Sequence, residues 1–214
     1  MIKKIGVLAG EPVDTDMGVD YLKAKGMLAY PYPAASTAAA QTQFQMLPES
    51  KRNEKISMLM REMRSDGIKD VMVYCNSLSS TVDTGAIAES LGMKAVTPLM
   101  AYREIAREYE TIGVMAGNCQ GLAGIERAIL GSNPKCIVLG VSLYKMVLAI
   151  ENFEPQMDIF KRCGVASVLD FYGTMGAQAI VLGCTHFPYL YDEIKAACPV
   201  PLIDPADRMF EMLR

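Results

Sequence analysis

The chain has 214 residues, of which 51% are apolar and 21% are charged, with 21 Lys and Arg against 24 Asp and Glu. This composition supplies ample core for a folded chain and excludes the disordered and collagen-like classes. A net charge of −3 without a block of Lys and Arg argues against nucleic acid or an anionic membrane as the main partner.

The cysteines and the N-terminus indicate a compartment. The apolar run from Ile5 to Gly10 is shorter than a secretory signal, and residues 137–150 are too short to cross a bilayer. We therefore expect a cytoplasmic protein whose thiols stay reduced. Cysteines stand at 75, 119, 136, 163, 184 and 198 without a C-x-x-C pair, and there is one histidine, so we expect free thiols and no metal site.

Apolar, β-branched runs alternate with helical patterns along the chain, which is typical of an α/β fold with mostly parallel sheets. The predicted strands are residues 2–8, 70–75, 94–96, 111–116, 136–141, 179–183 and 202–204. Helices are expected over 49–65 with Gly67 as the stop, after an N-cap at Asn118 with Gly131 as the stop, and after Pro188 as far as Pro199. Residues 34–45 read as a loop running into a helix that carries polar ligands.

An internal repeat divides the chain into halves. The hexamer Ile-Gly-Val-Leu-Ala-Gly at residues 5–10 recurs as Ile-Gly-Val-Met-Ala-Gly at 112–117, an offset of 107 residues and half the chain. A second echo relates residues 71–77 to 179–185, each an apolar run followed by a cysteine and small polar residues. The sequence therefore predicts two similar α/β halves with a boundary near Thr97 and Pro98.

Cys75 and Cys184 both follow predicted strands, one in each half. Ligands of open α/β sheets bind beyond the carboxyl ends of the strands, so two halves related by an approximate two-fold would bring both thiols to one cleft. Ser77, Thr81, Thr185 and the amides of the following helices could hold a carboxylate there. Thiols on both sides of an anion suit inversion at a carbon acid, in which one thiolate removes a proton and the opposite thiol delivers one.

Thiols suit both roles in this reaction. A free thiol with a pKa of about 8.5 is a few per cent thiolate at neutral pH, so it can act as a base or, protonated, as an acid. His186 follows Cys184 by two residues and is the only histidine of the chain. Two interpretations stay open for it, assistance to the thiol and a structural hydrogen bond near a helix start.

Two segments resemble a known family. Residues 181–188, Val-Leu-Gly-Cys-Thr-His-Phe-Pro, are similar to the second cysteine signature of glutamate racemases, members of the cofactor-independent aspartate/glutamate racemase superfamily. Residues 75–77, Cys-Asn-Ser, resemble the first signature of that superfamily with Ser in place of Thr. Residues 112–129 and 202–204 resemble the opening and the late strand of the second domain, so the resemblance covers most of the chain.

The resemblance implies two parallel-sheet α/β domains, residues 1–97 with 205–214 and residues 98–204, related by a pseudo-two-fold with the active site in the cleft between them. It also implies racemisation of glutamate or aspartate by two cysteines, with an acidic amino acid as the small-molecule ligand and with neither pyridoxal phosphate nor a metal. A homodimer is left open, since each site can be built within one chain.

The same resemblance assigns roles to individual residues. The acid/base pair would be Cys75 and Cys184, with His186 tuning the second thiol. The residues expected to hold the substrate include Asn76, Ser77 and Thr185. Tyr32, within Pro-Tyr-Pro, falls where glutamate racemases carry Pro-Tyr-Gly beside the substrate, and Glu151 corresponds to an acidic residue of the family.

The first loop departs from glutamate racemases, which carry an Asp-Ser pair after the first strand, where the Asp helps the first cysteine. Ala9 and Gly10 stand there instead, and Leu8-Ala9-Gly10 followed by Pro12 is closer to the first loop of aspartate racemases, which usually have Glu in place of His186. A loop is expected over residues 9–16. The carboxylates available in it are Glu11, Asp14 and Asp16, and Gly10 and Glu11 are predicted to line the substrate site.

Two alternatives to an amino-acid racemase follow from these residues. The scaffold also suits other two-cysteine isomerases, such as a hydantoin racemase or a maleate cis–trans isomerase. A non-catalytic carboxylate-binding regulatory protein is the alternative from another class. The pair of thiols argues against it, because binding alone needs no opposed thiols.

Overall fold

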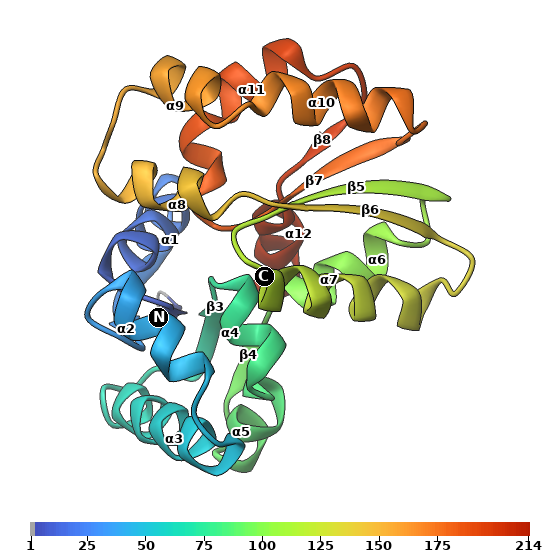
Figure 1. Cartoon of the computed structure of the whole chain (residues 1–214). Helices are drawn as coiled ribbons and strands as arrows, with labels where there is room; N and C mark the ends of the chain where they lie inside the picture. Colours follow the sequence, from blue (N-terminus) through green and yellow to red (C-terminus); the bar gives the residue numbers. More distant parts are fainter. Residues whose placement is uncertain (1–2) are drawn as a thin grey trace. The chain divides into compact units, whose positions relative to one another are not determined.

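The computed structural model describes residues 3–214 and divides the chain into two compact units (Figure 1). The first unit runs as far as Pro98 and includes Ala206–Arg214, and the second is Leu99–Pro205. The predicted domains, residues 1–97 with 205–214 and residues 98–204, differ from these limits by one residue at each boundary. Each unit is a parallel sheet surrounded by helices, so the predicted α/β fold with two parallel-sheet halves is confirmed.

The first unit contains a four-stranded sheet in the order β2-β1-β3-β4, with every pair parallel. Its strands are β1 Lys4–Ala9, β2 Leu28–Pro33, β3 Asp70–Val73 and β4 Lys94–Val96. Its helices are α1 Pro12–Ala24, α2 Ala38–Gln45, α3 Glu49–Ser65, α4 Asn76–Thr81, α5 Thr84–Ser90 and the returning α12 Pro205–Leu213.

The second unit repeats this topology in the order β6-β5-β7-β8, again all parallel. Its strands are β5 Thr111–Ala116, β6 Ile137–Ser142, β7 Ala179–Gly183 and β8 Leu202–Ile203. Its helices are α6 Pro98–Ile105, α7 Cys119–Ser132, α8 Tyr144–Glu151, α9 Gln156–Arg162, α10 Val165–Thr174, the 3₁₀ helix η1 Phe187–Leu190 and α11 Tyr191–Ala197.

The internal repeat coincides with this duplicated topology. The repeated hexamer forms β1 and β5, each lying second in its sheet. The second echo forms β3 and β7, each the neighbour of the hexamer strand on the same side, and each is followed by a cysteine. The two cysteines therefore occupy equivalent places in two equivalent sheets.

Helices cover both faces of each sheet. In the first unit Ile56, Met60 and Met63 of α3 are buried at helical spacing, and α3 ends just before Gly67, whose φ of +79° favours glycine. In the second unit α7 and α10 lie on opposite sides of the sheet (Figure 1). The buried Tyr172 hydroxyl of α10 donates to the Val114 carbonyl at 2.7 Å.

The last helix, α12, ties the end of the chain to the first unit. The Tyr21 hydroxyl of α1 donates to Asp207 at 2.7 Å. Lys3 and Lys94 each donate to a main-chain carbonyl near the end of α12, those of Leu213 and Met212 respectively. The first unit is therefore built from two separate stretches of sequence.

One strand was missed and two sequence predictions are wrong. Residues 28–33 were not among the predicted strands but form β2, which lies at an edge of its sheet, where proline is tolerated. Residues 9–16 are not a loop, since α1 begins at Pro12 with Glu11 as its N-cap. Gly131 does not end α7, which continues to Ser132.

Other bounds differ from the predicted ones by one or a few residues. β3 ends at Val73 rather than residue 75, so Cys75 becomes the N-cap of α4. The segment after Pro188 continues the short helix η1 before α11 begins. Ile2, expected in the first strand, lies outside the described residues. Within residues 3–214, no helix has the length and apolar character that crossing a membrane requires.

Candidate functional site

Cys75 lies just beyond the carboxyl end of β3 and is the N-cap of α4, with φ −161° and ψ 121°. Its carbonyl accepts from the backbone N–H of Ser79 at 3.1 Å and from the Ser79 hydroxyl at 2.8 Å. The residue is buried, with 4% of its surface exposed. The backbone of Cys75 is thus fixed at the edge where ligands of parallel sheets bind.

The Cys75 thiol lies among uncharged polar side chains. The Gln41 amide nitrogen Nε2 donates to Cys75 Sγ at 3.1 Å, and Ser77 Oγ lies 3.5 Å from the same sulfur. Gln41 Nε2 is 3.4 Å from Ser77 Oγ, and Gln45 Nε2 donates to Ser77 Oγ at 2.7 Å. One amide from α2 and one hydroxyl from α4 therefore contact this sulfur, and a second amide from α2 contacts that hydroxyl.

Gln41 and Gln45 were not singled out from the sequence. The signal was the stretch at residues 34–45, which predicts a loop running into a helix that carries polar ligands. The helix is present as α2, and its role in holding a ligand stays a prediction. Gly10 explains how Gln41 reaches the thiol, since a Cβ atom at position 10 would lie 2.0 Å from Gln41 Nε2. Gly10 therefore contributes to this site by leaving room for the amide.

The acidic residues near Gly10 cap the helix α1. The Asp14 carboxylate accepts from the backbone N–H groups of Gly10 at 3.1 Å and Glu11 at 2.9 Å, and Glu11 Oε1 accepts from Asp14 N at 3.4 Å. This capping box holds both side chains against the backbone of the helix start. Asp16 is exposed on the next turn. The sequence offered these three as replacements for a missing carboxylate, and the geometry gives two of them a structural task.

Asn76 and Tyr32 differ in their relation to Cys75. Asn76 is the first residue of α4, directly after Cys75, and is buried. The Tyr32 hydroxyl donates to Asp66 Oδ2 at 2.6 Å, at the C-terminal end of α3. Burial, and to a lesser extent this hydrogen bond, raises the pKa of Tyr32 above its usual value. The described contacts tie Tyr32 to α3 rather than to the Cys75 thiol, and its role beside a substrate stays a prediction.

In the second unit Cys184 directly follows β7 and is partly buried. Its carbonyl accepts from Phe187 N at 3.1 Å, which closes the turn before η1. A Cβ atom at Gly117 would lie 2.7 Å from Cys184 Sγ, so the sulfur lies against the backbone just after β5. Thr185, between the cysteine and His186, is buried.

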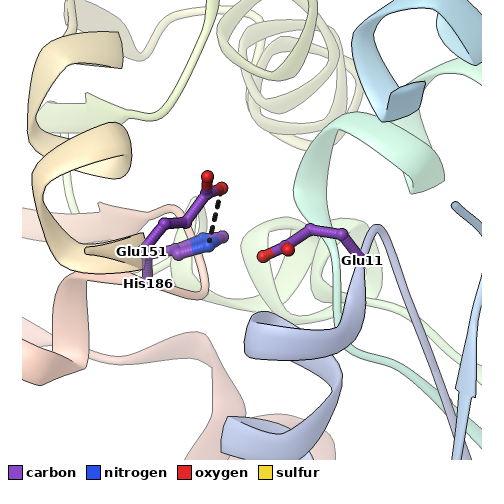
Figure 2. A group of neighbouring side chains, drawn as sticks. All are labelled: Glu11, Glu151 and His186. Atoms are coloured by element: carbon purple, nitrogen blue, oxygen red, sulfur yellow. Dashed lines mark ion pairs between the residues drawn. The ribbon is translucent and has the colours of Figure 1, made fainter. Parts of the chain in front are cut away.

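His186 lies beside the Cys184 thiol, and Glu151 lies on the other side of the imidazole. Cys184 Sγ lies 3.6 Å from His186 Nδ1, and the other ring nitrogen, Nε2, lies 3.5 Å from Glu151 Oε1. Figure 2 shows Glu151, the last residue of α8, extending toward the His186 ring. Glu11, drawn in the same figure, belongs to the first unit. The imidazole is buried, with one ring nitrogen facing the Cys184 sulfur and the other facing the Glu151 carboxylate.

Metal ligation within either unit by itself requires several ligand groups close together. Among residues 3–214, neither unit by itself gathers three carboxylate, thiol or imidazole groups within coordinating distance of one another. The Cys75 thiol lies beside an amide and a hydroxyl, and the Cys184 thiol lies beside an imidazole, which can exchange a proton with it. The sequence expectation of a reaction without metal or organic cofactor stays a prediction.

No protein-family model matches the chain. Glutamate racemase from Limosilactobacillus reuteri is 26% identical over 178 residues, which are 77% of this chain and 63% of that protein. The chain therefore spans less than two thirds of the length of this relative.

Solved structures resemble the whole chain. Glutamate racemase from Francisella tularensis, in complex with D-glutamate, matches with a TM-score of 0.70 at 17% identity, over 99% of this chain and 79% of that chain. An aspartate racemase homologue from Pyrococcus horikoshii matches with a TM-score of 0.70 at 15% identity, over 99% of both chains. The chain thus has the fold of these racemases, and its resemblance to the aspartate/glutamate racemase superfamily is supported in sequence and in fold.

Proposed function

We propose that this chain is a cofactor-independent racemase of an acidic amino acid, glutamate or aspartate, that uses Cys75 and Cys184 as its two acid/bases. The observation that carries the proposal is the duplication: equivalent strands of two equivalent sheets, β3 and β7, each lead to a cysteine whose sulfur has polar partners. A glutamate racemase among its relatives, and a neighbour in complex with D-glutamate, support this substrate class.

The reaction exchanges protons on two faces of one carbon. The thiolate of one cysteine takes the α-proton, so the Cα–H bond breaks and an S–H bond forms. The electron pair left on the α-carbon, delocalised into the carboxylate, then takes the proton of the opposite thiol, which becomes the thiolate. The product is the other enantiomer, and the two sulfurs have exchanged protonation states.

His186 and Glu151 support Cys184 in this scheme. In the tautomer that carries its proton on Nε2, which faces the Glu151 carboxylate at 3.5 Å, the Nδ1 atom of His186 has a lone pair facing Cys184 Sγ at 3.6 Å. A proton on Cys184 can then be shared with the imidazole, and a thiolate there is stabilised if the imidazole holds the proton. Thr185, Ser77 and Asn76 are the proposed ligands of the substrate.

The proposal places a condition on the chain, that both sulfurs reach one α-carbon from opposite faces. The test is incubation in D2O with each enantiomer of glutamate and aspartate, and with a hydantoin and maleate for comparison. Proton NMR follows the α-proton while polarimetry follows inversion. We expect deuterium to enter the product enantiomer before the recovered substrate, because the proton removed and the proton delivered belong to different sulfurs.

Other outcomes contradict the proposal. Equal early deuteration of substrate and product would show one base rather than two. Turnover of the hydantoin or of maleate alone would favour another two-cysteine isomerase. Absence of exchange with every compound would favour a binding protein.

A further inference from the structure

The hydrogen bonds around Cys75 have a direction. An amide nitrogen only donates, so Gln45 Nε2 at 2.7 Å occupies a lone pair of Ser77 Oγ. The hydroxyl proton of Ser77 is then available to Cys75 Sγ at 3.5 Å, and Gln41 Nε2 donates to the same sulfur at 3.1 Å. Gln41 thus donates to the sulfur and the Ser77 hydroxyl can donate to it, and donors favour the ionised form of an acid.

The elements that supply these donors carry no charge of their own. Neither α2 nor α4 contains a titratable residue. The ionisable side chains on the adjoining segment are Glu11 and Asp14, whose carboxylates cap α1 beside Gly10. A nearby carboxylate raises the pKa of a thiol, so the amide and hydroxyl donors act against that charge.

We propose that Gln41 is a positioning residue that, through its amide, holds Cys75 in the thiolate form, in a space that glycine at position 10 keeps open. The catalytic meaning of this thiolate, that Cys75 rests as the base, depends on the proposed function. Gln45 supports the thiolate indirectly, because its amide donates to Ser77 Oγ and so directs the Ser77 hydroxyl proton toward the sulfur.

Gly10 supplies an independent way to remove the amide. A methyl group at position 10 would lie 2.0 Å from Gln41 Nε2, 2.1 Å from its Cδ and 2.3 Å from its Oε1. These atoms are the end of a flexible side chain, and the φ of Gly10 is not positive, so Gly10→Ala expels the Gln41 amide without demanding a new backbone. Gly10→Ala and Gln41→Leu should therefore have the same effect on Cys75, and the double variant should add little.

The test measures the acidity of Cys75 without any substrate. The full-length protein is treated with iodoacetamide from pH 5 to 10, and alkylation is quantified by mass spectrometry of the tryptic peptide 70–94, in which Cys75 is the sole cysteine. Peptide 196–208, with Cys198 alone, is the internal reference. The variants are Gln41→Leu, the isosteric Gln41→Glu and Gly10→Ala. Gln43→Leu, an exposed glutamine on the same helix, is the matched control.

We expect Gln41→Leu and Gly10→Ala to raise the midpoint of the Cys75 profile by about one pH unit, and Gln41→Glu to raise it further, since a charged acceptor replaces a donor. The rate below the midpoint should fall by less than about tenfold, because a thiolate of higher pKa is more nucleophilic. Gln43→Leu and the Cys198 profile should not move.

Unchanged midpoints in Gln41→Leu and Gly10→Ala would overturn the proposal, as would a lowered midpoint in Gln41→Glu. Thermal unfolding of each variant shows whether a shift arises from misfolding, and Gly10→Ala leaves the glutamine itself intact. If the midpoints shift but no amino acid is racemised, the network stands and the proposed function fails. If racemisation is found but the midpoints stay, only this inference fails.

Discussion

The two units place a cysteine at the same point of the same topology and surround it differently. Both repeated hexamers end in a glycine that makes room for the site. At Gly117 the space is filled by the Cys184 sulfur, whereas at Gly10 it is filled by the Gln41 amide, which in turn contacts Cys75. Cys75 lies among neutral donors, and Cys184 lies beside an imidazole backed by a carboxylate.

The difference teaches that the repeated topology fixes the position of a sulfur, whereas the side chains beside that sulfur differ between the units. For a racemase this has a kinetic limit. The two enantiomers have equal free energies, so kcat/KM must be equal in both directions. Unequal partners for the two thiols can make kcat differ between the enantiomers, but KM must then differ by the same factor.

The largest expected effect removes either sulfur. Cys75→Ala and Cys184→Ala should each lower racemisation by about 10²–10⁴-fold, the range of a lost general acid or base. Polarimetry with both enantiomers checks this, with Cys119→Ala, an exposed cysteine, as the control. Full turnover in either single variant would break the pairing of the two thiols.

A smaller effect follows from filling the glycine of the second unit. Gly117→Ala puts a methyl group 2.7 Å from Cys184 Sγ and should displace the sulfur itself. A misplacement near 1 Å can cost about 100-fold in rate. Gly131→Ala, where a methyl group meets nothing within 4 Å, is the control. An active Gly117→Ala enzyme would show that Cys184 tolerates the shift.

The carboxylate behind His186 should matter less than the thiol. Glu151→Gln removes the charge beside the imidazole, and we expect turnover to fall about 10-fold, by analogy with the outer partners of metal-bound histidines. The pH profile of kcat should change with it. Glu126→Gln, exposed on α7, should leave both unchanged. A wild-type profile in Glu151→Gln would remove Glu151 from the scheme.

Each unit contains a buried tyrosine whose raised pKa makes stability depend on alkaline pH. Burial raises the pKa of Tyr172, so the folded chain keeps this proton above pH 10, where the unfolded chain loses it. The unfolding free energy therefore falls as pH rises above 10, by at most about 1.4 kcal/mol per pH unit for this group. Urea unfolding from pH 9.5 to 11 should show a flatter dependence in Tyr172→Phe. Tyr32→Phe tests the same direction in the first unit, and a slope unchanged in both would contradict the assignment.

The smallest effect concerns helix capping after the repeated hexamers. Asn118 and Glu11 occupy equivalent positions and cap α7 and α1, Asn118 by accepting from Gly121 N at 2.8 Å. Asn118→Ala should cost about 1 kcal/mol of unfolding free energy. Thermal unfolding measures it, and an unchanged midpoint would show that the cap is dispensable.

Much of the fold could be predicted from local patterns. The buried positions of α3 and the Asn118 cap depend on neighbours within a few residues, and the repeat located equivalent strands. β2 was not predicted. Its two prolines are compatible with a strand only at a sheet edge, and the sequence does not show which strand lies there. The start of α1 escaped because Glu11 is an unusual N-cap and the glycine before it suggests a loop.

Some residues of the site could likewise be predicted from local motifs, and others could not. Cys75, Cys184 and His186 stand in contiguous motifs, so the sequence located them. Gln41 lies 34 residues before Cys75, and only the packing of α2 beside Gly10 brings its amide to the sulfur. Tyr32 illustrates the reverse case, since its motif is present while its hydroxyl contacts Asp66.

The return of α12 has a consequence for biosynthesis. A ribosome delivers the chain from its N-terminus, and the second unit, one continuous stretch, is complete in sequence once Pro205 has emerged. The first unit waits for Ala206–Arg214, although it contains the first strand to be made. The contacts of Lys3, Tyr21 and Lys94 with α12 form only then. Cys75 therefore lies in a complete first unit only after residues 206–214 have been synthesised.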